Sequence, residues 1–352
     1  MNGLHGGDIY DDCLKEQTEG KVLLDFSANI NPLGMPGRVQ QAVIRALEDA
    51  VHYPDPKCRK LRRRLARTYG LSEEFFLCGN GGADLIYRLA YALRPKSALL
   101  PAPTFAEYEE AMKQGGTRCI FYEMDEGLQI REDILDRMEE PVNVMFLCNP
   151  NNPTGLLIPQ QLLLRILEKA VRKQILLVLD ECFLDFTGQE ERSLIAYVKE
   201  TPYLFILKSF TKMYAMPGIR LGYGISGNRT LLERMETAGQ CWGVSVLASE
   251  AGIAALEETE YKEKAVRLVK EERAWLKREL EACGMQVWDG QADYLFFRTQ
   301  GKWDLYEQLL PYGILIRKCG NYRGLDRSCY RIAVKDREAN QRLIEALRKS
   351  GG

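Results

Sequence analysis

The sequence predicts an α/β protein with a mostly parallel sheet, followed by a smaller α+β domain. Between residues 75 and 225, short runs of strand-forming residues alternate with longer amphipathic stretches, which is typical of βα units. Several of these runs are almost entirely apolar, as strands covered by helices on both faces must be. The length agrees with this reading, because 352 residues correspond to about two domains.

Six runs are expected to form strands of the large sheet. They are SALLP from residue 97, RCIFYEM from 118, VNVMFLC from 142, ILLVLD from 175, YLFILK from 203 and LGYGI from 221. Helices are predicted where apolar residues recur at the helical period, at 82–94, 105–115, 130–139, 159–173 and 190–199. Alternation of this kind implies helices on both faces of the sheet.

The last third of the chain has a different pattern. A long charged helical region, roughly 244–282, precedes four short strand-like runs and a closing helix at 336–349. Helices followed by several short strands predict a separate α+β domain. We place the large domain at residues 41–240 and the small domain at 241–352. Residues 1–40 have too little apolar material to fold alone, so we expect them to pack on the small domain or on a partner subunit.

Composition excludes several classes of function. The 48 basic and 49 acidic residues nearly cancel, so the basic excess of a nucleic-acid-binding protein is missing. Only two histidines are present, which argues against a histidine-rich metal site and a Ser-His-Asp triad. No two of the ten cysteines form a CxxC pair, and we interpret them as free thiols in a reducing compartment. No apolar run approaches the ~18 residues of a membrane span, and the polar, acidic start is unlike a signal peptide, so we expect a cytoplasmic protein.

Two loop segments are candidates for ligand binding. The glycine cluster Cys78–Asp84 (CGNGGAD) precedes a predicted helix, whose unpaired N–H groups and dipole suit a phosphate. A cluster of this kind is also common as an ordinary turn. The stiff loop Asn149–Gly155 (NPNNPTG) follows a buried strand, where open α/β sheets bind ligands, although a plain rigid turn fits equally well.

Two charged residues are candidates for the chemistry itself. Asp180 ends the apolar run ILLVLD, and a buried acid is costly unless it caps a helix or pairs with a positive group. The segment 208–223 (KSFTKMYAMPGIRLGY) follows another strand, and desolvation together with neighbouring cations can make a lysine there a usable nucleophile. Most lysines are simply solvated. Lys212 is singled out because Ser209, Arg220, the glycine turn and Asp180 all lie at strand ends of one sheet.

Together, GNGGAD, NPNNPTG, DECF and SFTKMYAMPGIRLGY resemble the fold-type I pyridoxal-phosphate enzymes, specifically the histidinol-phosphate aminotransferase group. The resemblance extends over essentially the whole chain. It implies a large domain with a mostly parallel seven-stranded sheet flanked by helices, and pyridoxal 5′-phosphate as the cofactor. It also implies a homodimer with shared active sites, in which Tyr53 of VHYPDP reaches the cofactor phosphate of the neighbouring subunit.

By position, this resemblance assigns most of the cofactor site. Lys212 holds the cofactor aldehyde as a Schiff base, Asp180 pairs with the protonated pyridine nitrogen, and Asn152 hydrogen-bonds the ring hydroxyl. The resemblance assigns the cofactor phosphate to Gly82, Ala83, Ser209, Thr211 and Arg220, and ring stacking to Tyr108. These roles are physically sensible, because an anionic Asp180 keeps the ring able to accept electrons from Cα. An arginine and helix amides also give charge-assisted contacts to a dianion.

Peripheral residues are expected to choose the reaction. HGGDIYDD and LDFSANINPLGMP resemble the threonine-phosphate decarboxylase branch, which serves cobalamin biosynthesis, more than typical histidinol-phosphate aminotransferases. Phe183 favours the same branch, since aminotransferases usually have tyrosine there. The resemblance assigns the substrate carboxylate to Arg331 with Asn29 or Asn31, and the substrate phosphate to His5 and Arg323.

The working hypothesis is decarboxylation of L-threonine O-3-phosphate to (R)-1-amino-2-propanol O-phosphate. Lys212 and water are equal candidates for the proton donor to Cα. The alternative enzyme is a histidinol-phosphate-type aminotransferase that uses 2-oxoglutarate. A ligand-sensing regulator and a structural scaffold are alternatives of another class, which retention of Lys212 and Asp180 disfavours. We expect a small phosphorylated amino acid as the partner, with no nucleic acid, membrane or metal.

Overall fold

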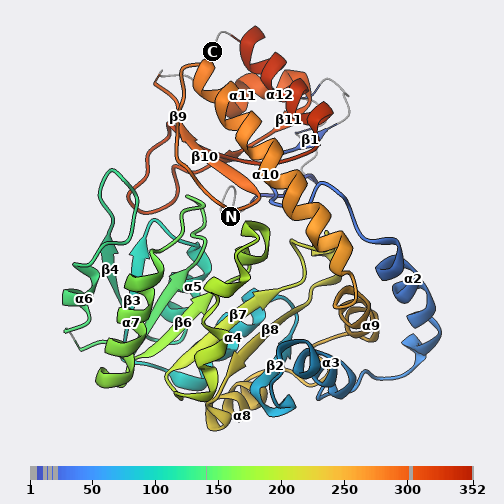
Figure 1. Cartoon of the computed structure of the whole chain (residues 1–352), viewed down its shortest axis with the longest axis vertical. Helices are drawn as coiled ribbons and strands as arrows, with labels where there is room; N and C mark the ends of the chain where they lie inside the picture. The colour runs from blue at the N-terminus through green and yellow to red at the C-terminus, as the bar shows by residue number, and fades with distance from the viewer. Residues whose placement is uncertain are drawn as a thin grey trace.

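The computed structural model describes residues 6–10, 14, 18, 23–139, 141–300 and 304–350. Three sheets organise these residues: one of seven strands, one of four and one of two. Figure 1 shows the seven-stranded sheet and its helices below the four-stranded sheet, with α10 running between them. We call these parts the large unit and the small unit. No helix in the described ranges is both long and apolar enough to cross a membrane.

The large sheet is mostly parallel, as predicted. Its strands, in spatial order, are β2 (Phe76–Gly79), β8 (Gly222–Ser226), β7 (Leu204–Ser209), β6 (Leu176–Asp180), β5 (Val144–Cys148), β3 (Ser97–Ala102) and β4 (Arg118–Glu123). Only β8 runs antiparallel to its neighbours β2 and β7. All six predicted runs form strands. β2 was not among them, because its four residues run directly into the glycine cluster.

Helices cover both faces of this sheet. They are α3 (Arg59–Tyr69), α4 (Gly82–Leu93), α5 (Ala106–Gln114), α6 (Ile134–Arg137), α7 (Gln160–Lys173) and α8 (Arg229–Ala238). Successive residues of β5 alternate between two apolar clusters: Met145 and Leu147 belong to one, Val144 and Phe146 to the other. Side chains of a strand alternate between faces, so the nearly continuous apolar runs reflect burial on both sides.

Short 3₁₀ helices replace or extend several predicted elements. They are η1 (Glu48–Val51), η2 (Glu73–Phe75), η3 (Leu184–Thr187), η4 (Glu190–Arg192), η5 (Leu194–Lys199), η6 (Pro217–Ile219) and η7 (Leu310–Tyr312). The predicted helix at 190–199 is therefore two 3₁₀ segments. Ser193 separates them, and its hydroxyl accepts a hydrogen bond from the backbone N–H of Ile195 and caps the second one.

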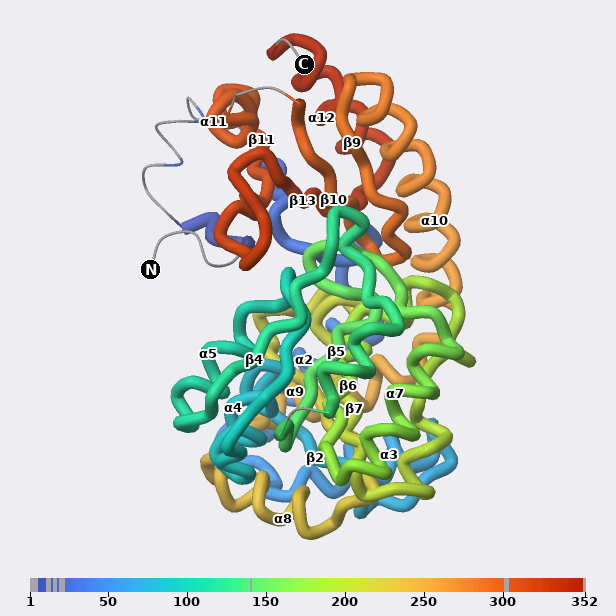
Figure 2. Tube along the Cα trace, turned by 90° about the vertical axis from the view of Figure 1, so that its left-hand side faces the viewer, coloured from blue at the N-terminus to red at the C-terminus, as the bar shows by residue number. Residues whose placement is uncertain are grey.

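The small unit is built on an antiparallel sheet. Its strands, in order, are β12 (Arg317–Lys318), β13 (Cys329–Ala333), β10 (Tyr294–Arg298) and β9 (Gln286–Val287). α10 (Thr259–Ala282), α11 (Leu305–Leu309) and α12 (Arg337–Lys349) accompany it. The predicted helical region 244–282 is two helices, because α9 (Val246–Ala255) ends before α10 begins. Figure 2 shows α10 and α12 together at the top and the large unit below.

The N-terminal part of the chain contacts both units. β1 (Leu24–Asp25) pairs in parallel with β11 (Ile314–Leu315), and Phe26 is wholly buried in the apolar cluster of the small unit. α2 (Gly37–Ala46) then packs against α9, which also contacts α3 beside the large sheet. The domain boundaries at residues 40 and 240 stay a prediction. The pairing of β1 places the residues that follow it between the two units.

Candidate functional site

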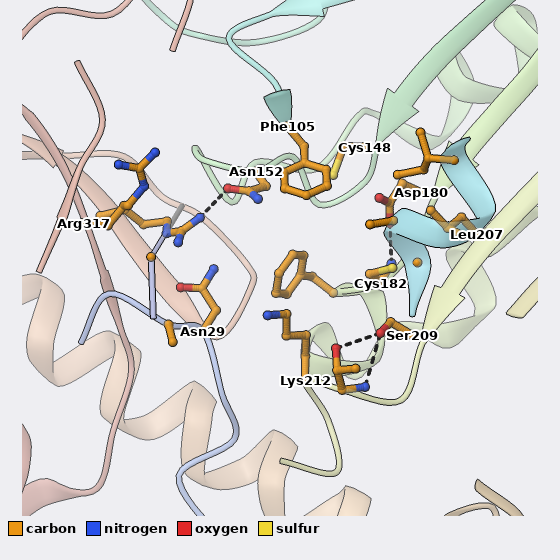
Figure 3. Close-up of a pocket in the computed structure, with 18 of the residues that line it drawn as sticks. Asn29, Phe105, Cys148, Asn152, Asp180, Cys182, Leu207, Ser209, Lys212 and Arg317 are labelled. Atoms are coloured by element: carbon orange, nitrogen blue, oxygen red, sulfur yellow. Dashed lines mark hydrogen bonds between the residues drawn. The ribbon is translucent and has the colours of Figure 1, made fainter. Parts of the chain in front are cut away.

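A cavity of about 310 Å³ lies where the carboxyl ends of the large sheet meet the small unit. Figure 3 shows its lining, which includes Asn29, Phe105, Cys148, Asn152, Asp180, Cys182, Ser209, Lys212 and Arg317. These residues come from segments far apart in the sequence, and Cys148, Asp180 and Ser209 are the last residues of β5, β6 and β7. Carboxyl ends of strands are where open α/β sheets bind ligands. We call this space the central cavity.

One end of the central cavity suits an anion. α4 begins at Gly82, so its unpaired N–H groups and positive dipole end face this corner, and Ala83 also lines it. Gly81 has φ 85°, and a Cβ built there would lie 2.6 Å from Nη2 of Arg220. Only glycine therefore lets the guanidinium approach the turn. An arginine and helix amides together suit a phosphate dianion.

Two hydroxyl groups complete this corner. Ser209 at the end of β7 and Thr211 both line the cavity, and their oxygens lie 2.8 Å apart. The backbone N–H of Thr211 also donates to the Ser209 hydroxyl over 3.2 Å. One hydroxyl donates to the other, so the pair leaves one O–H that can donate to a ligand in the cavity. The structure thus brings together all five residues that the sequence assigned to the phosphate.

Another part of the cavity wall carries a buried carboxylate. Asp180 ends β6; its Oδ2 accepts a hydrogen bond from the Tyr108 hydroxyl at 2.6 Å, and its Oδ1 accepts one from the Cys182 N–H at 2.9 Å. Burial raises the pKa of Asp180, while the hydrogen bonds from Cys182 and Tyr108 act in the opposite direction. A cation placed against this carboxyl would favour its charged form.

The position of Tyr108 corrects one expectation. Tyr108 is wholly buried, stacks on Phe146 with ring centroids 5.0 Å apart, and does not line the central cavity. Phe105, three residues earlier, lines it instead. The reason is local: α5 begins at Ala106, so Phe105 stands at the N-cap while Tyr108 faces the sheet. The ring that can stack on a cofactor is therefore Phe105, and Tyr108 supports Asp180.

Lys212 lines the central cavity, and its side chain is half buried. Burial lowers its pKa, and the charges of Arg331 and Arg220 lower it further, whereas Asp293 and Cys182 raise it. A lowered pKa leaves more of the amine as the free base, which is the nucleophilic form. The lysine that the sequence singled out thus lies in the cavity lining and has a lowered pKa.

Lys208, the other lysine of this segment, is an internal ion-pair partner. Its Nζ lies 2.9 Å from Oδ1 of Asp185 and 3.8 Å from Oε2 of Glu181, and its side chain is 6% exposed. Burial alone lowers the pKa of Lys208, but the carboxylates of Asp185 and Glu181 raise it well above its ordinary value. An amine held protonated in this way is a poor nucleophile.

Replacing Lys208 with methionine is expected to lower the free energy of unfolding by about 3–5 kcal/mol, because buried Glu181 loses its paired cation and Asp185 keeps only Lys262 among the described residues. Burial raises the pKa of Asp185, but Lys208 and Lys262 lower it to about 2, below the ordinary 3.8. The ion pair of Lys208 and Asp185 therefore stabilises the wild-type fold fully above about pH 4, and this contribution is lost as the pH falls toward 2.

Urea unfolding of the wild type and of Lys208→Met measures the loss in the free energy of unfolding. Borohydride-trapped pyridoxal phosphate should still map to Lys212; a label that disappears with Lys208 would reverse the two assignments.

Arginines of the small unit face the large unit across the cavity. Arg331 on β13 is 5% exposed; it donates to Oδ1 of Asn152, and to the Ser27 carbonyl at 3.0 Å. Asn152 Oδ1 also accepts from the Tyr322 hydroxyl at 3.3 Å. These contacts join the NPNNPTG loop to the small unit. Both Arg331 and Asn152 line the cavity, and their roles as carboxylate site and cofactor contact stay predictions.

Arg317 is a cavity residue that the sequence analysis missed. It begins β12, is 4% exposed, and its Nη2 donates to Oδ1 of Asn321 at 2.9 Å. Its guanidinium carbon lies 5.5 Å from the ring centroid of Tyr322. The run GILIRK was interpreted only as a strand. The signal in the sequence was an arginine inside an apolar run. A charge that such a run would bury needs a partner, and this need could have indicated a binding residue.

Three predicted substrate or cofactor residues lie outside the lining of the central cavity. Arg323 does not line the cavity; its Nη2 lies 3.2 Å from Oε1 of Glu109, and its side chain is 46% exposed. Asn31 also lies outside the cavity lining and donates to the Met213 carbonyl at 2.7 Å, which corrects its assignment; Asn29 does line the cavity. Tyr53 is 79% exposed, away from this chain's own cavity. His5 lies outside the described residues.

Residues 21–347 match the family of class I and II aminotransferases. The chain belongs to this family. It is 38% identical to the threonine-phosphate decarboxylase of Salmonella typhimurium, over 99% of this chain and 96% of that one. Family membership and the fold-type I architecture, both predicted from the motifs, are thereby confirmed, and the family implies pyridoxal phosphate.

Two solved structures are similar to this chain in both fold and sequence. The histidinol-phosphate aminotransferase of Clostridium acetobutylicum superposes with a TM-score of 0.88 and is 33% identical, covering 93% of this chain and 98% of that one. The L-threonine-O-3-phosphate decarboxylase of Porphyromonas gingivalis superposes with a TM-score of 0.82 at 27% identity, covering 92% and 98%. The two reactions considered from the sequence are thus both represented among similar proteins.

Proposed function

We propose that the protein is a cytoplasmic, homodimeric, pyridoxal-phosphate-dependent decarboxylase that converts L-threonine O-3-phosphate into (R)-1-amino-2-propanol O-phosphate. The observation that carries the substrate class is the pair Arg317 and Arg331. Both are buried arginines of the small unit that line the cavity, in addition to Arg220 at the anion corner. A ligand with two anionic groups beyond the cofactor phosphate fits this arrangement.

The residues present fit pyridoxal 5′-phosphate. The anion corner offers Arg220, two hydroxyls and helix amides for its phosphate, and Asp180 offers a carboxylate for its pyridine nitrogen. Lys212 supplies the amine for its aldehyde, Asn152 lies within the same lining for the ring hydroxyl, and Phe105 is available to stack on the ring. When bound, this cofactor supplies a cationic ring system that accepts the electrons released at the substrate Cα.

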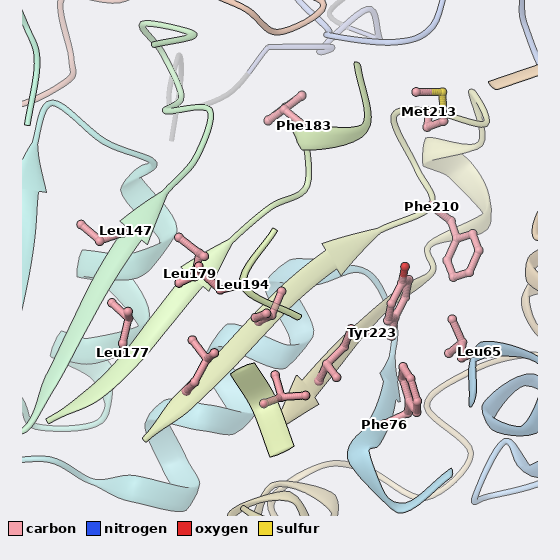
Figure 4. Packing of buried hydrophobic residues seen from close by; sticks show 14 of the residues in the cluster. Leu65, Phe76, Leu147, Leu177, Leu179, Phe183, Leu194, Phe210, Met213 and Tyr223 are labelled. Atoms are coloured by element: carbon pink, nitrogen blue, oxygen red, sulfur yellow. The ribbon is translucent and has the colours of Figure 1, made fainter. Parts of the chain in front are cut away.

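Decarboxylation, rather than transamination, is supported by Phe183. Phe183 follows β6, lines the cavity and stands at the edge of the apolar cluster that includes Leu147 and Leu179 (Figure 4). Its ring meets Tyr294 edge-on with centroids 5.0 Å apart. No hydroxyl is offered to the cofactor from this position, unlike the tyrosine usual in aminotransferases. The 38% identity to a threonine-phosphate decarboxylase supports the same choice.

The side chains of this protein have separable tasks in the proposed reaction. Arg331 binds the substrate carboxylate, with Asn29 beside it in the lining, and we assign Arg317, in place of Arg323, to the substrate phosphate. Loss of CO₂ leaves an electron pair at Cα, which must take up one proton. The amine of Lys212 is the group that holds this proton and delivers it to Cα. The apolar wall of Phe105 and Phe183 limits access of water.

A homodimer is supported by exposed apolar side chains in and around α2 and η1. Ile44 on α2, Leu47 between the two helices and Val51 on η1 are all more than half exposed. Tyr53 stacks on the half-exposed Trp242 with ring centroids 4.4 Å apart. Such a group of apolar side chains is typical of an interface. The cysteines in the described residues are free, which fits a reducing compartment.

The decisive experiment is incubation of the purified protein and cofactor with L-threonine O-3-phosphate, without any keto acid. We expect CO₂ release in amounts equal to the aminopropanol phosphate formed. L-Threonine without phosphate is the matched control, and its kcat/KM should fall by at least about 10²-fold, because charge-assisted contacts at Arg317 are lost. Absence of CO₂, together with glutamate-dependent conversion of the cofactor to pyridoxamine phosphate, would instead establish the aminotransferase.

A further inference from the structure

Residues 319–328 join β12 to β13 and reach from the small unit to the large unit; we call them the anchor loop. Hydrogen bonds within the loop give it a defined shape. The N–H of Tyr322 donates to the Cys319 carbonyl at 3.0 Å, and the N–H of Leu325 donates to the Tyr322 carbonyl at 3.1 Å. Tyr322 lines the central cavity, whereas its neighbour Arg323 does not. Two consecutive side chains of one turn therefore have different surroundings.

On the cavity side, the anchor loop holds Arg317. The side-chain oxygen of Asn321 accepts from Nη2 of Arg317 at 2.9 Å, and the ring centroid of Tyr322 lies 5.5 Å from its guanidinium carbon. The Tyr322 hydroxyl also donates to Oδ1 of Asn152 at 3.3 Å. A planar guanidinium takes the direction that its hydrogen-bond and ring partners allow. The loop therefore orients the arginine that the proposed function assigns to the substrate phosphate.

On the outer side, Arg323 contacts two elements of the large unit. Its guanidinium carbon lies 3.8 Å from the ring centroid of Phe121 on β4, and its Nη2 lies 3.2 Å from Oε1 of Glu109 on α5. The Arg323 side chain is 46% exposed, so solvent partly screens the ion pair. An exposed ion pair and a cation–π contact each shift an equilibrium by about two- to fivefold, and together by about tenfold. These contacts are strong enough to hold a loop and too weak to decide the stability of the fold.

The backbone of the anchor loop also comes close to the large unit at the next residue. Gly324 has φ 82°, in the left-handed region that favours glycine, and a Cβ built there would lie 4.0 Å from the carbonyl oxygen of Ala102. Ala102 ends β3, which is the neighbour of β4 in the large sheet. Arg323 therefore stands where the loop meets the edge of the sheet, and its side chain joins the two.

We propose that Arg323 is a positioning residue that sets the preference for a phosphorylated substrate, because it anchors the loop that orients Arg317. The identity of the substrate rests on the proposed function, whereas the anchoring does not. Without the contacts of Arg323, the loop leaves the large unit more often, and Asn321 and Tyr322 no longer hold the guanidinium in place. The substrate phosphate stands apart from the bond that breaks at Cα. A weaker contact with it therefore acts on substrate binding rather than on the chemical step.

Steady-state kinetics of the holoenzyme test the preference. In Arg323→Met, we expect the KM for L-threonine O-3-phosphate to rise about tenfold and kcat to stay within about twofold of the wild type. The kcat/KM for L-threonine should change by less than about twofold, because this substrate has no phosphate for Arg317 to bind. A variant that is merely less stable would lose kcat for both substrates alike. An unchanged KM for the phosphorylated substrate, or an equal loss for both substrates, overturns the proposal.

Lys318→Met is the matched control. Lys318 has a 45% exposed side chain and also makes a cation–π contact, with its Nζ 4.2 Å from the ring centroid of Tyr306. It pairs with Asp304 at 3.4 Å and with Glu307 at 3.5 Å. All three partners belong to the small unit, so the same change removes the same kinds of contact away from the junction of the units. We expect the KM for L-threonine O-3-phosphate to stay within about twofold of the wild type. A tenfold rise would show a general effect of lost cations and would overturn the specific role of Arg323.

Opening of the anchor loop is measured without any turnover through Cys319 at its base. Cys319 is 0% exposed, and burial raises the pKa of its thiol to about 12, so it reacts with iodoacetamide only when the loop opens. In Arg323→Met, we expect alkylation of Cys319, mapped by mass spectrometry, to become about tenfold faster. Cys78 in the large unit is also buried and should keep its rate, since only global unfolding would expose both thiols. An unchanged rate at Cys319 overturns the anchoring.

Glu109→Gln tests the same contact from the large unit, and Arg323→Lys tests it by rescue. Glu109→Gln removes the ion pair and leaves the contact of Arg323 with Phe121, so the KM and the alkylation rate should each rise by about two- to fivefold. Adding this change to Arg323→Met should cause little further effect, because the pair is already broken. Arg323→Lys keeps a cation and should stay within about threefold of the wild type. Fully additive losses, or a lysine variant as impaired as the methionine variant, contradict the anchoring.

The two readouts separate this role from the proposed function. Faster alkylation of Cys319 in Arg323→Met, with no CO₂ released by the wild type, would refute the proposed function alone. An active decarboxylase whose KM and alkylation rate are both unchanged in Arg323→Met would refute the role of Arg323 alone.

Discussion

Replacing Lys212 with alanine is expected to lower CO₂ release from L-threonine O-3-phosphate by at least about 10³-fold. Positioned proton transfer alone contributes about 10²–10⁴-fold, and the change also removes the amine that receives the cofactor aldehyde. Lys212 is the cavity lysine with a lowered pKa, whereas Lys208 is held protonated by Asp185 and Glu181. Single-turnover measurements with saturating cofactor would separate the loss of chemistry from weaker binding.

Lys212→Arg separates charge from nucleophilicity. Arginine keeps a cation in the central cavity but cannot release its proton or attack an aldehyde. We expect this variant to be as inactive as the alanine variant and to leave no borohydride-stable adduct. Activity within tenfold of the wild type in either variant would show that another group handles the proton, and water would then become the leading candidate.

Asp180→Asn is expected to weaken cofactor binding by about 10²-fold or more. Removing one charge from a buried, paired site costs about 3–5 kcal/mol, and each 1.36 kcal/mol corresponds to a factor of ten. The amide keeps the shape of the side chain, but its single oxygen can replace only one of the two acceptors that serve Tyr108 and the Cys182 N–H. The loss therefore reports the charge that faces the pyridine nitrogen together with one internal hydrogen bond. Equilibrium titration of the cofactor, followed by its absorbance, measures the change.

Glu181→Gln provides the control for this experiment. Glu181 is the next residue along the chain and is 1% exposed, and its carboxylate accepts from the Ser193 hydroxyl at 2.6 Å, outside the central cavity. We expect it to lower stability without changing the absorbance of the bound cofactor. Equal affinity for the cofactor in Asp180→Asn and the wild type would refute the pairing of Asp180 with the ring nitrogen.

Much of the fold and of the cofactor site could be predicted because the deciding signals are local. A strand buried on both faces must be apolar along its length, and so runs such as VMFLC and ILLVLD were recognisable. The ends of those runs mark the edge of the sheet where ligands bind. Asp180 ends β6, Asn152 and Lys212 follow β5 and β7, and Arg220 precedes the antiparallel strand β8. The structure brings all four to the central cavity.

The tertiary structure alone decided which of two similar residues faces the cavity. Phe105 and Tyr108 are three residues apart in PTFAEY, and the start of α5 turns one ring to the cavity and the other to the sheet. Arg317 and Arg323 lie in one segment, yet the pairing of β12 with β13 sets Arg317 opposite Arg331 and leaves Arg323 near the surface.

Arg331 illustrates the same limit most clearly. In the sequence it stands in the short apolar run CYRIAV. Its partners, Asn152 and the Ser27 carbonyl, come from other parts of the chain and meet it only through the packing of the two units. By itself, the sequence determined the order of the elements and the chemistry at the strand ends, because those depend on neighbouring residues. The direction of each side chain, and the charges that surround it, were decided by long-range pairing and packing.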